Sequence, residues 1–223
     1  MRIEKLKDNP EAKRLILVFS GWAASPQLFQ HLTADSLTNI WICYDYRELL
    51  FNESLERFDE IHLVAWSLGV WVAAYLMQDI IPAKTNGKRW TTTAINGTES
   101  PIDDEKGIPE AIFRGTLEHL DEKGLSKFIR RMCDSKELSA IYQQLPPRPL
   151  SELQEELQTL YDTIQKQGAI ESFTWSNIWL SRKDRIFPIS NLRHYWQGHP
   201  CIRETDTSHL PFFQWDKWET LWI

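Results

Sequence analysis

A serine stands where an expected strand turns into an expected helix. Ser67 follows the apolar run Ile61–Trp66 and precedes the apolar stretch 68–81, in the sequence Val-Ala-Trp-Ser-Leu-Gly-Val. In the pattern G-x-S-x-G, small residues on both sides of a serine let a strand and a helix approach at a strained turn that exposes the hydroxyl. Ala65 replaces the first glycine but keeps that position small. Ser67 is therefore a candidate nucleophile; its alternative role is to cap the following helix.

A serine hydroxyl becomes nucleophilic when a histidine takes its proton and a carboxylate orients that histidine. Where the serine lies at such a turn, the chain order is serine, acid, histidine. Asp184, in the loop after a late strand, and His209, after the last strand, follow this order. Three other carboxylates remain open as the acid: Glu99, Asp103 and Asp206. The remaining histidines lie in expected strands, helices or surface loops and have weaker claims: His31, His62, His119, His194 and His199.

Acyl transfer also needs hydrogen-bond donors aimed at the oxyanion that develops during the reaction. Leu68, the residue after the candidate nucleophile, offers one backbone N–H. The loop after the first strong strand offers a second, from Trp22, and Gly21 permits the tight turn that this requires. Nucleophile, acid, base and donors in this order predict hydrolysis of an acyl compound.

These residues need a parallel sheet to position them. Strands buried on both faces read as continuous apolar or β-branched runs. Six such runs are present: Leu15–Ser20, Asn39–Tyr44, Ile61–Trp66, Thr91–Ile95, Ser176–Leu180 and Cys201–Glu204. Alternation with helical segments predicts an α/β fold, a mostly parallel sheet flanked by helices. The aromatic segment Phe212–Trp222 is expected to form a closing helix.

Strand patterns stop between residues 98 and 168. Four helical stretches replace them, the last two separated by a proline-rich break: Pro109–Leu120, Gly124–Cys133, Lys136–Gln144 and Leu150–Gln167. We therefore expect a core formed by residues 1–97 and 169–223, with residues 98–168 as a helical lid inserted between late strands.

Composition excludes several classes of protein. The chain has 223 residues, with 25 Lys and Arg against 31 Asp and Glu, a net charge of −6. This charge argues against chain-wide binding to nucleic acid or an anionic membrane. No run reaches the roughly 18 apolar residues of a membrane-spanning helix. Three distant cysteines lack metal-binding spacing: Cys43, Cys133 and Cys201. We expect a cytoplasmic monomer without metal or cofactor.

Three stretches resemble the pimeloyl-[acyl-carrier protein] methyl ester esterases of the BioG type: Phe19–Trp22, Ala65–Trp71 and Ala94–Ile102. With Asp184 and His209, the resemblance extends from the first strong strand to the C-terminus. It implies an α/β-hydrolase with a helical lid that releases methanol from pimeloyl-[acyl-carrier protein] methyl ester in biotin synthesis. It also implies Ser67 as nucleophile, His209 as base and acid, and Asp184 as the residue that orients His209.

An acidic partner would need a basic surface. Acyl carrier proteins are acidic, so an enzyme that acts on them needs local positive charge despite its own acidic total. Lys127, Arg130 and Arg131 are three and four residues apart and therefore share one helix face, with Arg114 nearby. We expect this face to dock the carrier protein; the alternative is an ordinary solvated charged face.

Two other functions remain open. The same serine, acid and histidine would serve a general carboxylesterase or thioesterase for small acyl compounds. A catalytically silent binding module with the same fold is the second alternative. A general esterase would not depend on the carrier protein, whereas the carrier-specific esterase would. A silent binding module would not react with a fluorophosphonate at Ser67, whereas either enzyme would.

Overall fold

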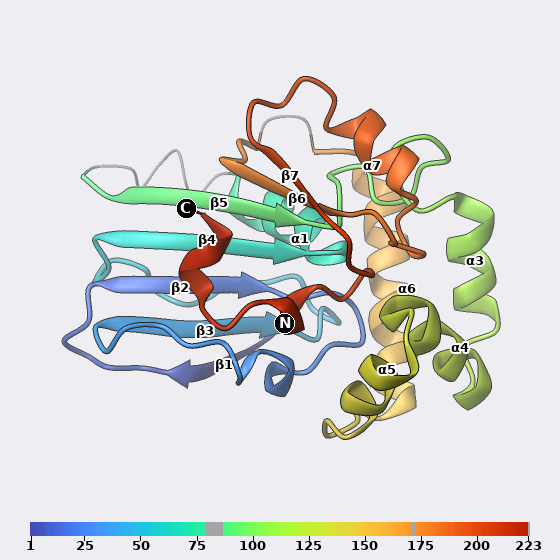
Figure 1. Ribbon diagram of the computed structural model, residues 1–223, viewed down its shortest axis with the longest axis horizontal. Helices are drawn as coiled ribbons and strands as arrows, with labels where there is room; N and C mark the ends of the chain where they lie inside the picture. The colour runs from blue at the N-terminus through green and yellow to red at the C-terminus, as the bar shows by residue number, and fades with distance from the viewer. Residues whose placement is uncertain (79–86, 171–172, 223) are drawn as a thin grey trace.

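The computed structural model describes residues 1–78, 87–170 and 173–222. These residues form a seven-stranded sheet with the order β1-β3-β2-β4-β5-β6-β7 (Figure 1). The strands are β1 (Arg2–Lys7), β2 (Arg14–Phe19), β3 (Thr38–Tyr44), β4 (Glu60–Trp66), β5 (Arg89–Ile95), β6 (Asn177–Ser181) and β7 (Ile202–Thr205). β1 pairs antiparallel with β3, and all the other neighbouring pairs are parallel. This is the mostly parallel α/β sheet that the sequence predicts.

The central strands are apolar for a physical reason. β2 and β4 pair in register, and every residue after the first of each strand is buried. A strand covered on both faces has no solvent side on which to place polar residues. All six predicted strands are present, with bounds shifted by at most two residues.

One strand was not predicted, and one expected helix is absent from the described residues. β1, which precedes the first strong strand, was not predicted, because its sequence Arg-Ile-Glu-Lys-Leu-Lys carries charges that protect an exposed sheet edge. The expected closing helix is two short 3-10 turns, Phe212–Gln214 and Trp218–Leu221. Trp215 between them has extended backbone angles, and this break lets aromatic side chains on both sides pack into the core.

Two helices outside the 98–168 segment contact strands of the sheet. α1 (Leu68–Met77) begins immediately after Ser67 and contacts β2 and β4. The predicted helix extends to residue 81, of which residues 79–81 lie outside the described part of the chain. α7 (Ile189–Tyr195), which was not predicted, contacts β6. None of the helices in the described ranges is both long and apolar enough to cross a bilayer.

The four predicted helices of the 98–168 segment are present between β5 and β6. They are α3 (Glu110–Glu118), α4 (Glu122–Cys133), α5 (Lys136–Gln143) and α6 (Leu150–Gln167). They gather beyond the carboxyl ends of the parallel strands, at the right of Figure 1. α6 buries one face, which includes Leu153, Leu157 and Leu160. The helical segment therefore lies at the edge of the sheet where the predicted reactive residues also lie.

Candidate active site

Ser67 occupies a strained turn between β4 and α1. Its backbone has φ 59° and ψ −131°, and a non-glycine residue in such a region costs about 1–3 kcal/mol. Neighbouring glycines permit the close crossing. A Cβ on Gly69 would lie 2.3 Å from the carbonyl oxygen of Phe19, and a Cβ on Gly97 would lie 2.2 Å from that of Ser67. The Ser67 hydroxyl makes no capping hydrogen bond to α1, so its alternative role as a helix cap is not observed.

Hydrogen bonds connect Ser67 to a histidine and a carboxylate. The Nε2 atom of His209 lies 2.8 Å from Ser67 Oγ, and its Nδ1 atom lies 2.7 Å from Asp184 Oδ2. The other carboxylate oxygen of Asp184 accepts backbone N–H bonds from Ile186 and Phe187, at 2.7 and 2.9 Å. These bonds fix the carboxylate, so that it favours a proton on Nδ1 and leaves Nε2 as an acceptor for the serine proton.

The alternative carboxylates have other partners. Glu99 accepts hydrogen bonds from a tryptophan and a tyrosine, at 2.9 and 2.7 Å, and burial raises its pKa. Asp103 accepts two backbone N–H bonds within its own loop, and Asp206 lies 3.3 Å from an arginine nitrogen. Within the described ranges, Asp184 is the carboxylate at hydrogen-bond distance from His209.

Two residues that the sequence analysis did not assign to the site hold the backbone of His209. Its carbonyl oxygen accepts hydrogen bonds from Trp66 Nε1 at 2.8 Å and from Asn96 Nδ2 at 3.0 Å. Asn96, at the end of β5, also exchanges two 2.7 Å bonds with Ser181 at the end of β6. In the sequence, Asn96 lies within the Ala94–Ile102 stretch and was given no role of its own. The available signal was an amide side chain directly after a strand that ends in Ala-Ile, because an amide that becomes buried there must find hydrogen-bond partners.

The two predicted oxyanion donors lie beside Ser67. A Cβ on Gly21 would lie 3.0 Å from Ser67 Cβ, so the loop after β2 closely approaches the serine. Trp22 follows in that loop, and Leu68 is the first residue of α1, where backbone N–H groups have no helical acceptor. Neither of these two backbone N–H groups donates a hydrogen bond to another described residue.

A small, mainly apolar cavity covers Ser67. Its volume is about 20 Å³, which is room for about one water molecule. Phe113, Phe128 and Leu157 of the helical segment line it together with Trp22. Trp22 packs edge-on against Phe128 with ring centroids 4.7 Å apart, and its Nε1 donates to the Leu153 carbonyl at 2.9 Å. Side chains of the helical segment therefore cover the cavity next to Ser67.

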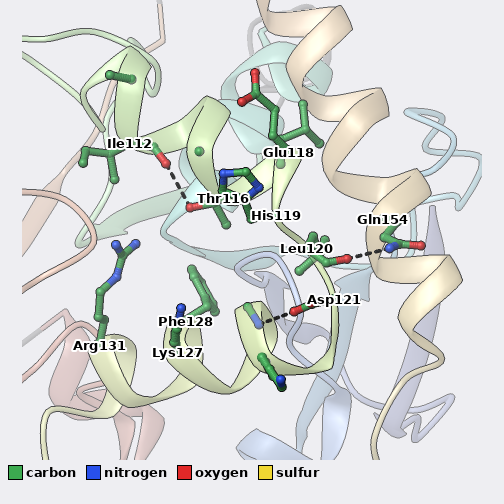
Figure 2. Close-up of a pocket in the computed structure, with 15 residues that line it drawn as sticks. Ile112, Thr116, Glu118, His119, Leu120, Asp121, Lys127, Phe128, Arg131 and Gln154 are labelled. Carbon is green, nitrogen blue, oxygen red and sulfur yellow. Dashed lines mark hydrogen bonds between the residues drawn. The ribbon is translucent and has the colours of Figure 1, made fainter.

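A larger groove of about 660 Å³ opens between α3 and α4 (Figure 2). Lys123, Lys127 and Arg131 contribute to its wall from α4. Thr116, Phe128 and Arg131 line both this groove and the cavity over Ser67. These three side chains therefore separate an open basic groove from a small apolar cavity.

The predicted docking residues are distributed unevenly around this groove. Lys127 and Arg131 line it, whereas Arg130 is exposed on α4 and is not part of the wall. Arg114 on α3 is not part of the wall either, and it pairs at 3.3 Å with Glu118, which lines the groove. Lys123, which was not among the predicted docking residues, lines the groove one turn before Lys127. A helix repeat of four residues, 123, 127 and 131, could have found it.

Comparison with known proteins agrees with this architecture. The sequence profile of the family "Pimeloyl-ACP methyl esterase BioG" matches residues 3–221. The crystal structure of BioG from Haemophilus influenzae is 38% identical, with full coverage of both chains and a TM-score of 0.93. An esterase from Exiguobacterium antarcticum shares the fold at 11% identity, with a TM-score of 0.63 over 95% of this chain and 89% of its own.

A longer relative also matches. The malonyl-[acyl-carrier protein] O-methyltransferase of Bacteroides fragilis is 39% identical over 205 residues, which are 90% of this chain but 40% of that protein. The match of the family profile to almost the whole chain and the close structural likeness to BioG lead to one conclusion. This chain is an α/β-hydrolase that belongs to the pimeloyl-ACP methyl esterase family BioG, whose substrate is carried by an acyl carrier protein.

Proposed function

We propose that Ser67, His209 and Asp184 hydrolyse the methyl ester of pimeloyl-[acyl-carrier protein] methyl ester, a step of biotin synthesis. Family membership supports the substrate class. One observation carries the mechanism: an unbroken chain of hydrogen bonds runs from Ser67 Oγ through the His209 ring to Asp184. The same three residue types, in the same mutual arrangement, perform acyl transfer on unrelated folds.

In the first half of the reaction, Ser67 Oγ bonds to the ester carbonyl carbon while its proton passes to His209 Nε2. The carbonyl electron pair moves onto oxygen, and the N–H groups of Trp22 and Leu68 stabilise the resulting negative charge. Asp184 stabilises the imidazolium form of His209. The bond between the carbonyl carbon and the methoxy oxygen then breaks, and methanol leaves with the proton from Nε2.

In the second half, water attacks the pimeloyl group bound to Ser67. His209 Nε2 takes a proton from this water, and the same donors from Trp22 and Leu68 hold the second oxyanion. The bond between the carbonyl carbon and Ser67 Oγ breaks, and the serine recovers its proton from His209. The products are pimeloyl-[acyl-carrier protein], whose new carboxyl group ionises, and a free enzyme.

The helical segment 98–168 serves in this proposal as a lid. Phe113, Phe128 and Leu157 supply an apolar surface for the methylene groups of the acyl chain. Covering the reacting groups also strengthens every electrostatic interaction around the oxyanion, because water is excluded. The proposed site needs no residue from a second copy of the chain.

The carrier protein docks, in this proposal, on the α3–α4 face of the lid. Lys127 and Arg131 line the groove, Arg130 is exposed beside them, and Arg114 lies on α3. Their positive charge would complement an acidic carrier protein and raise its association rate. Arg114 is expected to contribute least, because it already pairs with Glu118.

The test compares methanol release by wild type and Ser67→Ala from pimeloyl-[acyl-carrier protein] methyl ester and from free methyl pimelate. We expect Ser67→Ala to lower kcat by about 10⁴-fold or more on both substrates. Wild type should prefer the carrier-bound ester. Reaction of wild type, but not of Ser67→Ala, with a fluorophosphonate provides the matched control for an activated serine.

Other outcomes would change the assignment. Unaltered hydrolysis by Ser67→Ala would exclude Ser67 as the nucleophile. Equal activity on free and carrier-bound esters, with loss of both in Ser67→Ala, would instead identify a general carboxylesterase that uses the same residues.

A further inference from the structure

Arg131 ends a row of positive side chains that leads toward Ser67. Lys123, Lys127 and Arg131 are spaced four residues apart on α4 and therefore lie one above the other. Eight residues of helix span about 12 Å. Figure 2 shows Arg131 extending from α4 toward α3 across the groove. Unlike the two lysines, Arg131 also lines the cavity that contains Ser67.

The guanidinium group of Arg131 has unused hydrogen-bond donors. Its Nε is buried and has no hydrogen-bond partner among the described residues. Burial lowers the pKa of Arg131, and no neighbouring carboxylate counteracts that effect. A buried donor that lacks an acceptor costs about 1–3 kcal/mol, more when it is charged. An acceptor supplied by the substrate would remove this cost.

The order of groups in the substrate indicates which acceptor this is. The methyl ester must lie at Ser67, and the methylene groups that follow suit the apolar walls formed by Phe113 and Leu157. The next polar atom along the substrate is the carbonyl oxygen of the thioester to the carrier protein. Thr116, Phe128 and Arg131 form the wall that such a chain passes on its way from the groove.

We propose that Arg131 donates a hydrogen bond to the carbonyl group at the far end of the acyl chain and thereby determines which chain lengths are hydrolysed. The inference rests on the proposed function and adds a role to one of its residues. Lys127 stays at the surface and meets the carrier protein, whereas Arg131 binds the acyl group itself. A planar guanidinium fits this task, because it presents several donors in a rigid arrangement.

The experiment uses small esters without any carrier protein, so that docking has no influence. One series consists of monomethyl esters of straight-chain dicarboxylic acids, in which the far carboxylate stands in for the thioester carbonyl as an acceptor. The second series consists of methyl esters of straight-chain monocarboxylic acids of the same lengths, which have no far acceptor. The measured quantity is the ratio of kcat/KM between the two esters of each length.

For wild type we expect this ratio to peak at one chain length. Arg131→Met should lower the ratio at the peak by about 10- to 100-fold, the effect of losing a hydrogen bond to a charged group. Arg131→Lys should retain part of the ratio, since it keeps the charge but loses the planar donors. Lys136→Met, on the exposed surface of α5, is the matched control and should leave the ratio unchanged.

Two results would overturn the proposal. An equal loss on both series in Arg131→Met would mean that Arg131 only supports the wall between groove and cavity. An unchanged ratio and an unchanged optimum would mean that Arg131 does not contact the far end of the chain. Ser67→Ala, assayed on the same esters, separates these failures from a failure of the proposed function, because it should lose both series whatever Arg131 does.

Discussion

Two arginines of the helical segment differ in whether they form ion pairs. Arg148, just before α6, has a side chain only 7% exposed, 2.6 Å from Glu156 and 3.1 Å from Asp45 at the end of β3. Glu156, which is fully buried, also accepts the backbone N–H of Tyr46 at 2.9 Å. Arg131, on α4, faces two cavities and has no such carboxylate partner among the described residues.

The two arginines therefore have different roles: Arg148 stabilises the fold, and Arg131 is placed to bind a ligand. At α6 the chain supplies both the cation and its anions, and the resulting cluster ties the helical segment to the edge of the sheet. At α4, Arg131 lines the cavity that contains Ser67, and it forms no ion pair with a described carboxylate. Arg131 is only partly buried, but its Nε donor is buried without an acceptor among the described residues, which costs free energy. Its retention at α4 is therefore best explained by a partner that arrives with the substrate.

Removing each arginine tests this contrast most directly. Arg148→Met should lower the free energy of unfolding by about 3–5 kcal/mol, because it leaves the buried Glu156 and Asp45 without their shared cation. Arg131→Met should lower it by less than about 1 kcal/mol, because no ion pair is broken. Urea unfolding of both variants measures the difference. Similar losses in the two variants would remove the distinction between the two arginines.

Asp45→Asn tests whether the charge of Asp45 stabilises the cluster formed by Arg148, Glu156 and Asp45, and the measured quantity is the pH dependence of stability. Burial by itself raises the pKa of Asp45, but the hydrogen bond from Arg47 and the charges of Arg148, Arg47 and Arg2 outweigh this effect and lower it. Asparagine also tolerates the positive φ of 57° at this position. We expect the variant to be about 1–3 kcal/mol less stable at neutral pH.

The sign of the pH effect follows from the direction of this shift. A lowered pKa in the folded state stabilises the protein above the unfolded value of about 3.9 and ceases to do so as pH falls through the lower folded value. The stability difference between wild type and Asp45→Asn should therefore shrink in acid. Urea unfolding between about pH 7 and about pH 3 measures it. A difference independent of pH would show that the charge of Asp45 does not stabilise the cluster.

The smallest expected effect is the change in KM when an exposed positive charge at the groove is reversed. Lys127→Glu should raise KM for the carrier-bound ester several-fold more than KM for free methyl pimelate, because exposed charges contribute at most about 1 kcal/mol each. Lys136→Glu introduces the same charge change on exposed α5, away from the groove. Steady-state kinetics at low salt would measure both variants. Equal effects of the two variants would favour an unspecific response to net charge over docking on the α3–α4 face.

Local patterns in the chain were sufficient to predict most of the sheet and to select Ser67, Asp184 and His209, which lie at hydrogen-bond distance from one another in the structure. Central parallel strands are apolar on both faces, so their runs are readable without knowledge of their neighbours. β1 was missed because an exposed edge strand carries charges. The closing segment was misjudged because its aromatic residues could form one helix, whereas the core accommodates them only in two short turns.

Long-range contacts decided what the local patterns left open. Which of the four candidate carboxylates contacts His209 depends on how two loops fold back on the sheet, and Asp184 is the one at hydrogen-bond distance among the described residues. The role of Asn96 is invisible in its neighbours, because its partners Ser181 and His209 lie 85 and 113 residues further along the chain.

The sequence by itself determined the strand-to-helix turn at Ser67 and the presence of a helical segment between β5 and β6, and it sufficed to select Asp184 and His209 as candidates. All of these follow from side-chain size and apolar periodicity within short windows. Only the tertiary structure decided which charges are compensated. Arg148 and Arg131 cannot be distinguished by local pattern alone, because an ion pair depends on where two distant segments meet in space.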